Sequence, residues 1–588
     1  MLKTKLLPWL RVILALTITH FFASFAPEML SSLEHGSEAH LLRAFFEIAT
    51  LFCLSFAVFY TSAGTGLPSF VLAIFFGVTA HELLEPILTN EAVLGTTVGL
   101  GATLILFSGG LETPWTNFKK LLWKILSLSF VGLGLTAILF SFSLLELGQL
   151  TGITVPLTVA ILLGAVLAST DPAAIIPVLR GLRFHNRDTK DIVFSESAMT
   201  DVTGTLLTVA FIGILGANIE VTSLMGGYKE LFTLETATIL GKQVLFGTGM
   251  GVLGYMLLTG LHKFKENHDE EFEADAAFFL FIPVCIFTLA VVLGGSGYLA
   301  AFIAGLLFML TKKLHHTERF FNQMIEGFLK PAIFLLLGGL VNIQDLISYA
   351  PIGIAAALTF MFIIRPFTVF VSLAPFTLGK KGMKIRELLF ISFVRETGAI
   401  PAVLLVTIVS LGWENMEAIV PVGMWVILAT LIIQPPLTPL VGRLLKVSTE
   451  MKDDAALKVN NPDEQFVILG SRGNSFVKRL PAAIDWTLRN GVGHLIVLHC
   501  PEENYSEKEE KQTLKLAQSE FKKWTKKLAD EGSPVIAFEF ITRHGYLQDN
   551  IAALKAEKSL SVAFVGRKML DYRAKQIQEL GVPLYFLD

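Results

Sequence analysis

The stretch Ile161–Arg180, ILLGAVLASTDPAAIIPVLR, says most about the architecture of this chain, because it is long and apolar enough to cross a membrane but carries an aspartate and prolines in its middle. Pro172 and Pro177 each remove a backbone donor, and Pro172 also disfavours helical geometry at Asp171. Non-helical backbone at membrane depth is tolerated where it is buried in protein or lines a cavity, and its free carbonyls often face ions. The stretch therefore predicts a membrane helix unwound around Ser169 to Asp171. A simple proline kink is the alternative.

The composition of the whole chain indicates a polytopic α-helical membrane protein. The 588 residues include 47 Phe and only 16% charged residues, and the mean hydropathy is +0.62, far from the average of soluble proteins. A net charge of −3 gives no basic footprint for nucleic acid. Cys53, Cys285 and Cys500 lie too far apart in the sequence to suggest a disulfide framework or a metal cluster.

Apolar windows of about 20 residues mark the expected membrane spans. We find fourteen, at residues 8–26, 42–61, 67–85, 92–111, 121–147, 154–180, 192–216, 237–261, 275–293, 297–311, 328–343, 350–378, 386–410 and 416–442. The first window follows Lys3 and Lys5 and ends in small residues, so it fits a cleaved signal sequence or a first membrane helix. We favour the retained helix.

The charges of the connecting loops predict the orientation of the chain. If the N-terminus is cytoplasmic, the inside loops hold nearly all loop lysines and arginines, among them Lys119, Arg187 and Lys381, whereas the outside loops hold Lys229. This asymmetry follows the positive-inside rule. The chain after Lys446 is then cytoplasmic, and we expect a multi-pass protein of a bacterial inner membrane.

The sequence divides into a membrane domain of 13–14 helices at 1–446, a polar linker at 447–463 and a smaller domain at 464–588. In the last part, FVILG, HLIVLHC, PVIAFEF, LSVAFVG and VPLYFLD alternate with amphipathic helices, which predicts a parallel α/β sheet. The turn GSRGNS, with Gly470 and Gly473, is a weak phosphate-loop signal. We expect a regulatory domain, with a nucleotide as one candidate ligand and protein contact or a degenerate domain as the alternative.

The segment Phe194–Thr205, FSESAMTDVTGT, places two carboxylates in an expected membrane helix, where ionisable groups are costly and so mark function. At helical spacing Ser197 and Asp201 share one face, and Glu196 and Thr200 share the adjacent face. This stripe offers carboxylate and hydroxyl oxygens, which suit a hard cation such as Na⁺.

The broken helix supplies more oxygen ligands only a short loop earlier in the sequence. Thr170 contributes a hydroxyl, Asp171 a carboxylate, and the unwound backbone free carbonyls. Together with Asp201, these groups predict a transient binding site for a transported monovalent cation.

The few cations within the membrane suggest which carboxylate has a permanent partner. Arg365 and Arg395 lie inside expected spans, and Glu396 follows Arg395 directly as its local candidate partner. Glu196 is then the best partner for Arg365, which leaves Asp201 without a permanent counter-charge. A proton or a cation would neutralise such a buried carboxylate. Because the two ligands exclude each other, one site could exchange them.

The spans also predict an internal repeat. Spans two to seven and nine to fourteen form two sets of six, and the odd span between them inverts the second set. The break at Asp171 and a second irregularity at Gly398 and Pro401 occupy the fifth place of each set. Paired broken helices that cross near the midplane of inverted repeats occur in several secondary transporters. We expect two inverted six-helix repeats with crossed broken helices.

A series of motifs makes most of the membrane part resemble the monovalent cation/proton antiporter superfamily, in its branch of Na⁺/H⁺ exchangers. In chain order they are LFSGGLETPW, ASTDPAAIIPVLRGL, SESAMTD, GSGYLAAFIAGLLF, PAIFLLLGGLVN, IRPFTVFV and VRETGAIPAVL. Several separate motifs in the same order make this resemblance specific.

The resemblance implies roles for individual residues. Asp201 would bind the cation and the proton in alternation, Glu196 and Ser197 would support the site, and Thr170 and Asp171 would lie at the helix crossing. The resemblance also implies a homodimer.

The second half of the chain also matches the family, and one position departs from it. Arg365 resembles the basic residue that faces the ion site, and Arg395, followed by Glu396, resembles the arginine of the second crossing helix. Thr200 stands where electroneutral members usually have Asn and electrogenic members have a second Asp, so we expect one cation to be exchanged for one proton.

These observations predict a secondary transporter, not an enzyme, that exchanges Na⁺ for H⁺ electroneutrally. A K⁺/H⁺ antiporter regulated through its cytoplasmic domain is the alternative. A cation channel is a remote alternative, because the polar residues cluster at one depth. An intramembrane aspartyl protease using Asp171 and Asp201 would need YD and GxGD motifs, and neither surrounds these residues.

Overall fold

A computed structural model of the protein divides into two compact units, Met1–Arg180 with Asp188–Val447, and Gly181–Arg187 with Ser448–Asp588. We describe each unit by itself. The structure describes residues 2–27, 39–62, 65, 68–113, 115–170, 175, 178–179, 182–217, 221–266, 275–308, 321–377, 382–450, 466–489, 494–501, 507–530, 536–557, 560–566 and 584–587.

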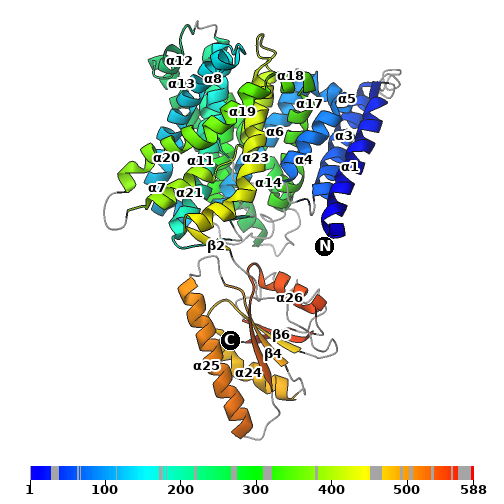
Figure 1. Ribbon diagram of the computed structural model, residues 1–588, viewed down its shortest axis with the longest axis vertical. Coiled ribbons are helices and arrows are strands. Elements are labelled where there is room, and N and C mark those ends of the chain that lie inside the picture. Colours follow the sequence, from blue (N-terminus) through cyan, green and yellow to red (C-terminus); the bar gives the residue numbers. More distant parts are fainter. Residues whose placement is uncertain are drawn as a thin grey trace. The chain divides into compact units, whose positions relative to one another are not determined.

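The first unit is a bundle of apolar helices (Figure 1). Its elements are α1 (Leu2–Ser24), α3 (Ala39–Ser62), α4 (Ser69–Thr79), α5 (His81–Leu88), α6 (Glu91–Glu112), α7 (Trp115–Leu126), η1 (Ser127–Gly132), α8 (Leu133–Thr151), α9 (Leu157–Ala168), α11 (Arg187–Gly216), α12 (Leu224–Glu230), α13 (Leu234–Glu266), α14 (Asp275–Val292), α15 (Gly297–Phe308), η3 (Ile325–Leu329), α17 (Lys330–Gly339), α18 (Ile343–Ser348), α19 (Ala350–Thr359), η4 (Phe360–Ile364), α20 (Arg365–Leu373), η5 (Ala374–Phe376), α21 (Ile385–Phe393), α22 (Ala399–Val409) and α23 (Ile419–Leu444).

Each of the expected membrane spans contains helix, so the prediction of a multi-pass helical protein is confirmed. Within the described residues, eight helices are long and apolar enough to cross a membrane, or nine if α4 and α5, which meet at 89°, count as one span. The remaining apolar segments are shorter helices, including α9 and α22. The expected count of 13–14 crossings and the inverted repeat stay predictions.

Two of the expected spans are broken where the sequence predicts. α9 ends at Ala168, Ser169 has extended backbone with ψ 150°, and Thr170 is not helical. The second break separates α21 from α22, and Gly398 precedes α22 with φ −115° and ψ −140°. Asp171 lies outside the described residues, so the prediction of unwound backbone is confirmed at Ser169 and Thr170.

Glycines let some helices of the bundle pack backbone to backbone. A Cβ on Gly110 of α6 would lie 2.3 Å from the carbonyl oxygen of Phe302, and one on Gly305 of α15 would lie 2.2 Å from that of Phe107. Such close approach through small residues is typical of helices that associate in a membrane.

The second unit contains the predicted parallel sheet. Its elements are β1 (Leu182–Phe184), β2 (Ser448–Glu450), β3 (Phe466–Ser471), α24 (Phe476–Arg489), β4 (His494–His499), α25 (Glu507–Asp530), β5 (Ala537–Thr542), α26 (Leu547–Glu557), β6 (Leu560–Gly566) and β7 (Leu584–Leu587). The strand order is β5-β4-β3-β6-β7, with all neighbours parallel. β3 is therefore the central strand: β4 and β5 follow on one side of it, and β6 and β7 on the other.

Hydrophobic cores cover both faces of this sheet. On one face Val467 packs with Leu480 of α24, and on the other Ile468 packs with Ile551 of α26. The five strands that the sequence predicts are all present, although β5 begins at Ala537, a few residues later than expected.

A second, two-stranded sheet was not predicted. β1 pairs antiparallel with β2, with Leu182 opposite Glu450 and Phe184 opposite Ser448. Each strand has only three residues, too few to show the alternating pattern by which a strand is recognised in a sequence.

Candidate functional site

The broken end of α9 meets α11 at Asp201. Ser169, the first residue after α9, donates a hydrogen bond from its hydroxyl to Asp201 Oδ1 over 2.9 Å. Gly204, one turn further along α11, allows this approach, because a Cβ there would lie 2.6 Å from the Ser169 Cβ. Asp201 is 8% exposed, so its carboxylate lies almost entirely within the protein.

Hydroxyl groups surround the second residue of the break. Ser197 Oγ donates to the Thr170 carbonyl over 2.6 Å, and the Thr170 and Thr200 hydroxyls lie 3.0 Å apart. Thr200 also contacts the Ser197 carbonyl at 3.0 Å, one turn back along α11. The structure thus brings Ser197, Thr200 and Asp201 of α11 together with Ser169 and Thr170, all of them buried.

A buried carboxylate behind this cluster binds two arginines. Glu196 Oε1 lies 2.6 Å from Arg365 Nη2 and 3.2 Å from Arg395 Nη1. Arg395 also donates to the carbonyl of Ala168, which is the last residue of α9. The Glu196–Arg365 pair that the sequence suggests is present, and Arg395 joins it.

The partner chosen for Arg395 from the sequence is wrong. Among the described residues, Arg395 contacts the Glu196 carboxylate and the Ala168 carbonyl, whereas Glu396 Oε1 accepts the backbone N–H of Ile175 over 3.1 Å. Residues 395 and 396 lie in the non-helical backbone between α21 and α22. Adjacent side chains there point in different directions, so each reaches a different part of the first break.

A further pair of hydroxyls holds the second break. Thr430 of α23 accepts the Thr397 backbone N–H at 3.2 Å, and the two threonine hydroxyls lie 2.7 Å apart. Both residues are fully buried. The sequence gives no sign of this contact, although Thr397 lies inside the VRETGAIP motif, since a threonine in an apolar helix carries no signal of its partner.

The arrangement provides carboxylate, hydroxyl and carbonyl oxygens at one place inside an apolar helical unit. No group of three or more His, Cys, Asp or Glu residues that could hold a resident metal ion occurs among the described residues. Oxygen ligands of this kind suit a transported monovalent cation or a proton better than a bound transition metal. Asp171, the other candidate carboxylate, lies outside the described residues.

Comparison with known proteins connects this geometry to a family. The sequence model of a family described as "Sodium/hydrogen exchanger, transmembrane" matches residues 18–443, a range that includes every residue named above in this section. It ends before the parallel sheet of the second unit begins.

Three curated relatives bear the names of antiporters. The K⁺/H⁺ antiporter NhaP2 of Shewanella sp. (strain MR-4) is 27% identical over 431 residues, 71% of this chain and 69% of that protein. The K⁺/H⁺ antiporter NhaP of Alkalimonas amylolytica is 29% identical over 61% of this chain and 59% of its own length. The Na⁺/H⁺ antiporter ApNhaP of Aphanothece halophytica is 26% identical over 41% of this chain and 44% of its own length.

Among solved structures, the sodium proton antiporter MjNhaP1 of Methanocaldococcus jannaschii is similar to this chain. The identity is 19% and the TM-score 0.49, with 74% of this chain and 99% of that chain covered.

Proposed function

The chain belongs to the sodium/hydrogen exchanger family, and we propose that it exchanges a monovalent cation for H⁺ by letting the two compete for the Asp201 carboxylate. Its relatives are cation/proton antiporters, so the predictions of a membrane transporter and against an enzyme are confirmed. The observation that carries the proposal is the hydrogen bond between Ser169 and Asp201, because it joins the break in α9 to the carboxylate of α11.

Competition follows from the burial of the carboxylate. A buried Asp201 is costly while it is charged, and either a proton or a bound cation lowers that cost. The Ser169 hydroxyl contacts it directly, and Thr170, Ser197 and Thr200 are linked by hydrogen bonds at the same break, so their oxygens would complete the coordination of a dehydrated cation. The same carboxylate cannot hold both ligands, so release of one accompanies binding of the other.

We further propose that one cation is exchanged for one proton. Thr200 precedes Asp201 and offers only a hydroxyl, which does not titrate. Arg365, the basic residue of α20, is held by Glu196 in a buried ion pair. Neither residue would release a second proton during the cycle.

Two cations are candidates for the substrate. The oxygen ligands and the family resemblance favour Na⁺ as the first expectation. The relatives that match over most of the chain are named K⁺/H⁺ antiporters, which favours K⁺. We therefore propose exchange of Na⁺ or K⁺, and the experiment below compares the two directly.

Several wider features belong to the same proposal. We propose two inverted six-helix repeats, a homodimer in a bacterial inner membrane, and a second unit that regulates transport from the cytoplasm. A nucleotide at the turn after β3 is the candidate regulator. Between β3 and β6 the sheet has a topological switch point, because the chain continues from β3 to one side of the sheet and from β6 to the other. Ligands of open parallel sheets bind at such a point.

The test is exchange in proteoliposomes, measured as loss of an imposed pH gradient when Na⁺, K⁺ or Li⁺ is added, with and without a clamped voltage. We expect Na⁺ or K⁺ to collapse the gradient at the same rate with and without the voltage clamp. Asp201→Asn should reduce exchange to the level of empty liposomes while the protein stays folded. Asp188→Asn, in the first turn of the same helix, is the matched control. Retained exchange in Asp201→Asn would remove the carboxylate from the mechanism.

A further inference from the structure

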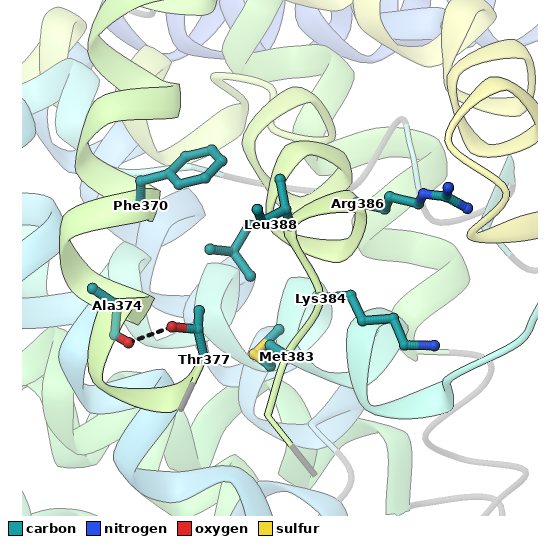
Figure 2. A pocket seen from close by; sticks show the side chains of 8 residues that line it. Phe370, Ala374, Thr377, Met383, Lys384, Arg386 and Leu388 are labelled. Atoms are coloured by element: carbon teal, nitrogen blue, oxygen red, sulfur yellow. Dashed lines mark hydrogen bonds between the residues drawn. The ribbon is translucent and has the colours of Figure 1, made fainter. Parts of the chain in front are cut away.

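A pocket lies where α20 and η5 end and α21 begins. Its volume is about 830 Å³, and Figure 2 shows the side chains around it. A backbone hydrogen bond links the two segments that line the pocket: Met383 N–H donates to the Phe376 carbonyl over 3.0 Å. This bond holds the residues just before α21 against the end of η5, so the two walls of the pocket are fixed relative to each other.

One part of the pocket is apolar and continues onto the outer surface of the helices. Phe370, Ala374 and Leu388 line it, together with Ile385, which is 65% exposed. On the same helices Phe367 is 53% and Leu389 39% exposed. Because the unit spans a membrane, exposed apolar side chains of this size are suited to contact with lipid acyl chains.

The other part of the pocket is basic. Lys384 and Arg386 line it, and both side chains are exposed. Figure 2 shows them extending to the same side, away from the Phe370 ring. The Glu387 carboxylate accepts the Lys384 backbone N–H over 3.0 Å and caps α21, so the side-chain charges, and not the helix terminus, are available to an anion.

We propose that this pocket binds an anionic phospholipid, with its phosphate at Lys384 and Arg386 and one acyl chain against Phe370 and Ile385. An amphiphile of this kind fits because the basic and apolar parts adjoin at the end of a membrane helix. A zwitterionic lipid carries a compensating positive charge near its phosphate and would bind less well. A soluble phosphate would gain nothing from the apolar part. This site goes beyond the proposed exchange function and does not depend on it.

The experiment is native mass spectrometry of the full chain, delipidated in detergent and titrated with phosphatidylglycerol or with phosphatidylcholine of the same acyl chains. We expect the wild type to prefer phosphatidylglycerol. The double variant Lys384→Gln/Arg386→Gln should weaken phosphatidylglycerol binding about tenfold and abolish the preference. Ile385→Ser should weaken the binding of both lipids, because it removes apolar contact. Lys119 is an exposed lysine of α7 that does not line the pocket. Lys119→Gln should therefore change neither the binding of phosphatidylglycerol nor the preference for it.

Four results would overturn the proposal: equal binding of the two lipids to the wild type, an intact preference in the double variant, an equal loss in Lys119→Gln, or full competition by free glycerol phosphate. The last result would mean an anion site without a role for the acyl chain. Melting temperatures measured on the same samples show that each variant is folded. Binding is read without transport, so a failure of the exchange assay leaves this test intact.

Discussion

Glu196 is the residue on which the buried charges depend, because one carboxylate serves Arg365 and Arg395 together. Three charges share this place, and Arg395 also reaches the end of α9 through the Ala168 carbonyl. The ion pair is thus tied to the backbone that precedes Ser169, the residue that contacts Asp201. A change at Glu196 should therefore disturb both stability and the geometry of the candidate cation site.

Glu196→Gln is expected to lower the free energy of unfolding by roughly 3–5 kcal/mol, because it leaves two buried guanidinium groups without their carboxylate. Thermal unfolding in detergent measures the loss. Adding Arg365→Met should recover only part of it, since Arg395 still lacks its partner. Full recovery in the double variant would show that Arg395 does not depend on Glu196, and simple additivity would argue against coupling between Glu196 and Arg365.

His499 makes a residue-scale prediction for the second unit. Its side chain is fully buried at the end of β4 and stacks on Phe540, with ring centroids 5.6 Å apart. Burial, with a smaller contribution from the charge of His544, lowers the pKa of His499 from 6.5 to about 4. The folded domain therefore keeps this ring neutral at a pH where the unfolded chain protonates it.

The domain at 464–588 should then be most stable above pH 6.5 and lose about 3 kcal/mol of unfolding free energy as the pH falls from 6.5 to 4. Urea unfolding of the separately expressed domain at several pH values measures this. His499→Phe should flatten the dependence, because it removes the buried ring that the unfolded chain protonates. An unchanged slope in His499→Phe would assign the pH dependence to other groups.

At the scale of elements, the contact between α11 and the break after α9 depends on a glycine. Gly204 faces Ser169, and a Cβ there would lie 2.6 Å from the Ser169 Cβ. Gly213 belongs to the same helix, and a Cβ there would meet nothing within 4 Å. The two positions therefore separate the effect of packing at the break from the effect of an alanine on the helix.

Gly204→Ala should push α11 away from Ser169, cost roughly 1–3 kcal/mol of stability and strongly reduce the exchange rate, because the Ser169–Asp201 hydrogen bond lengthens. Gly213→Ala should exchange at the wild-type rate. The gradient-dissipation assay compares the two variants at matched protein amounts. Equal activity would mean that the site tolerates a wider separation of the two elements.

At the scale of the whole molecule, the segment that precedes α11 belongs to the second compact unit, because its strand β1 pairs with β2. β1 ends three residues before α11 begins, and its partner strand β2 follows the last helix of the membrane unit. The segment that enters the helix of Asp201 is therefore hydrogen-bonded to the start of the C-terminal part of the chain.

A chain that ends after Glu450 keeps this sheet, whereas a chain that ends after Val447 loses β2. We expect the first truncation to retain exchange, because the residues of the candidate site lie in the membrane unit. The second should exchange more slowly, because β1 loses its partner. The proteoliposome assay compares both with the full chain. Equal rates in the two truncations would show that β1–β2 pairing has no effect on transport.

The type of each segment can be predicted from the sequence alone. Apolar windows located the membrane helices, Pro172 and Gly398 marked the two breaks, and the strand patterns of the last part located the parallel sheet. These features follow from local properties, namely hydropathy, backbone restriction and side-chain period. Glu196 and Asp201 also stood out locally, since charges inside an apolar helix are rare.

The pairing of side chains from distant segments becomes visible only in the folded protein. Arg395 contacts Glu196 and not its neighbour in the chain, Thr430 contacts Thr397, and β1 pairs with β2. Each of these contacts joins residues that are far apart in the sequence, and no local pattern encodes the partner. The physical reason is that a polar or charged side chain, or a three-residue strand, is satisfied by any suitable group within hydrogen-bond distance. Only the packing of the helices determines which group that is.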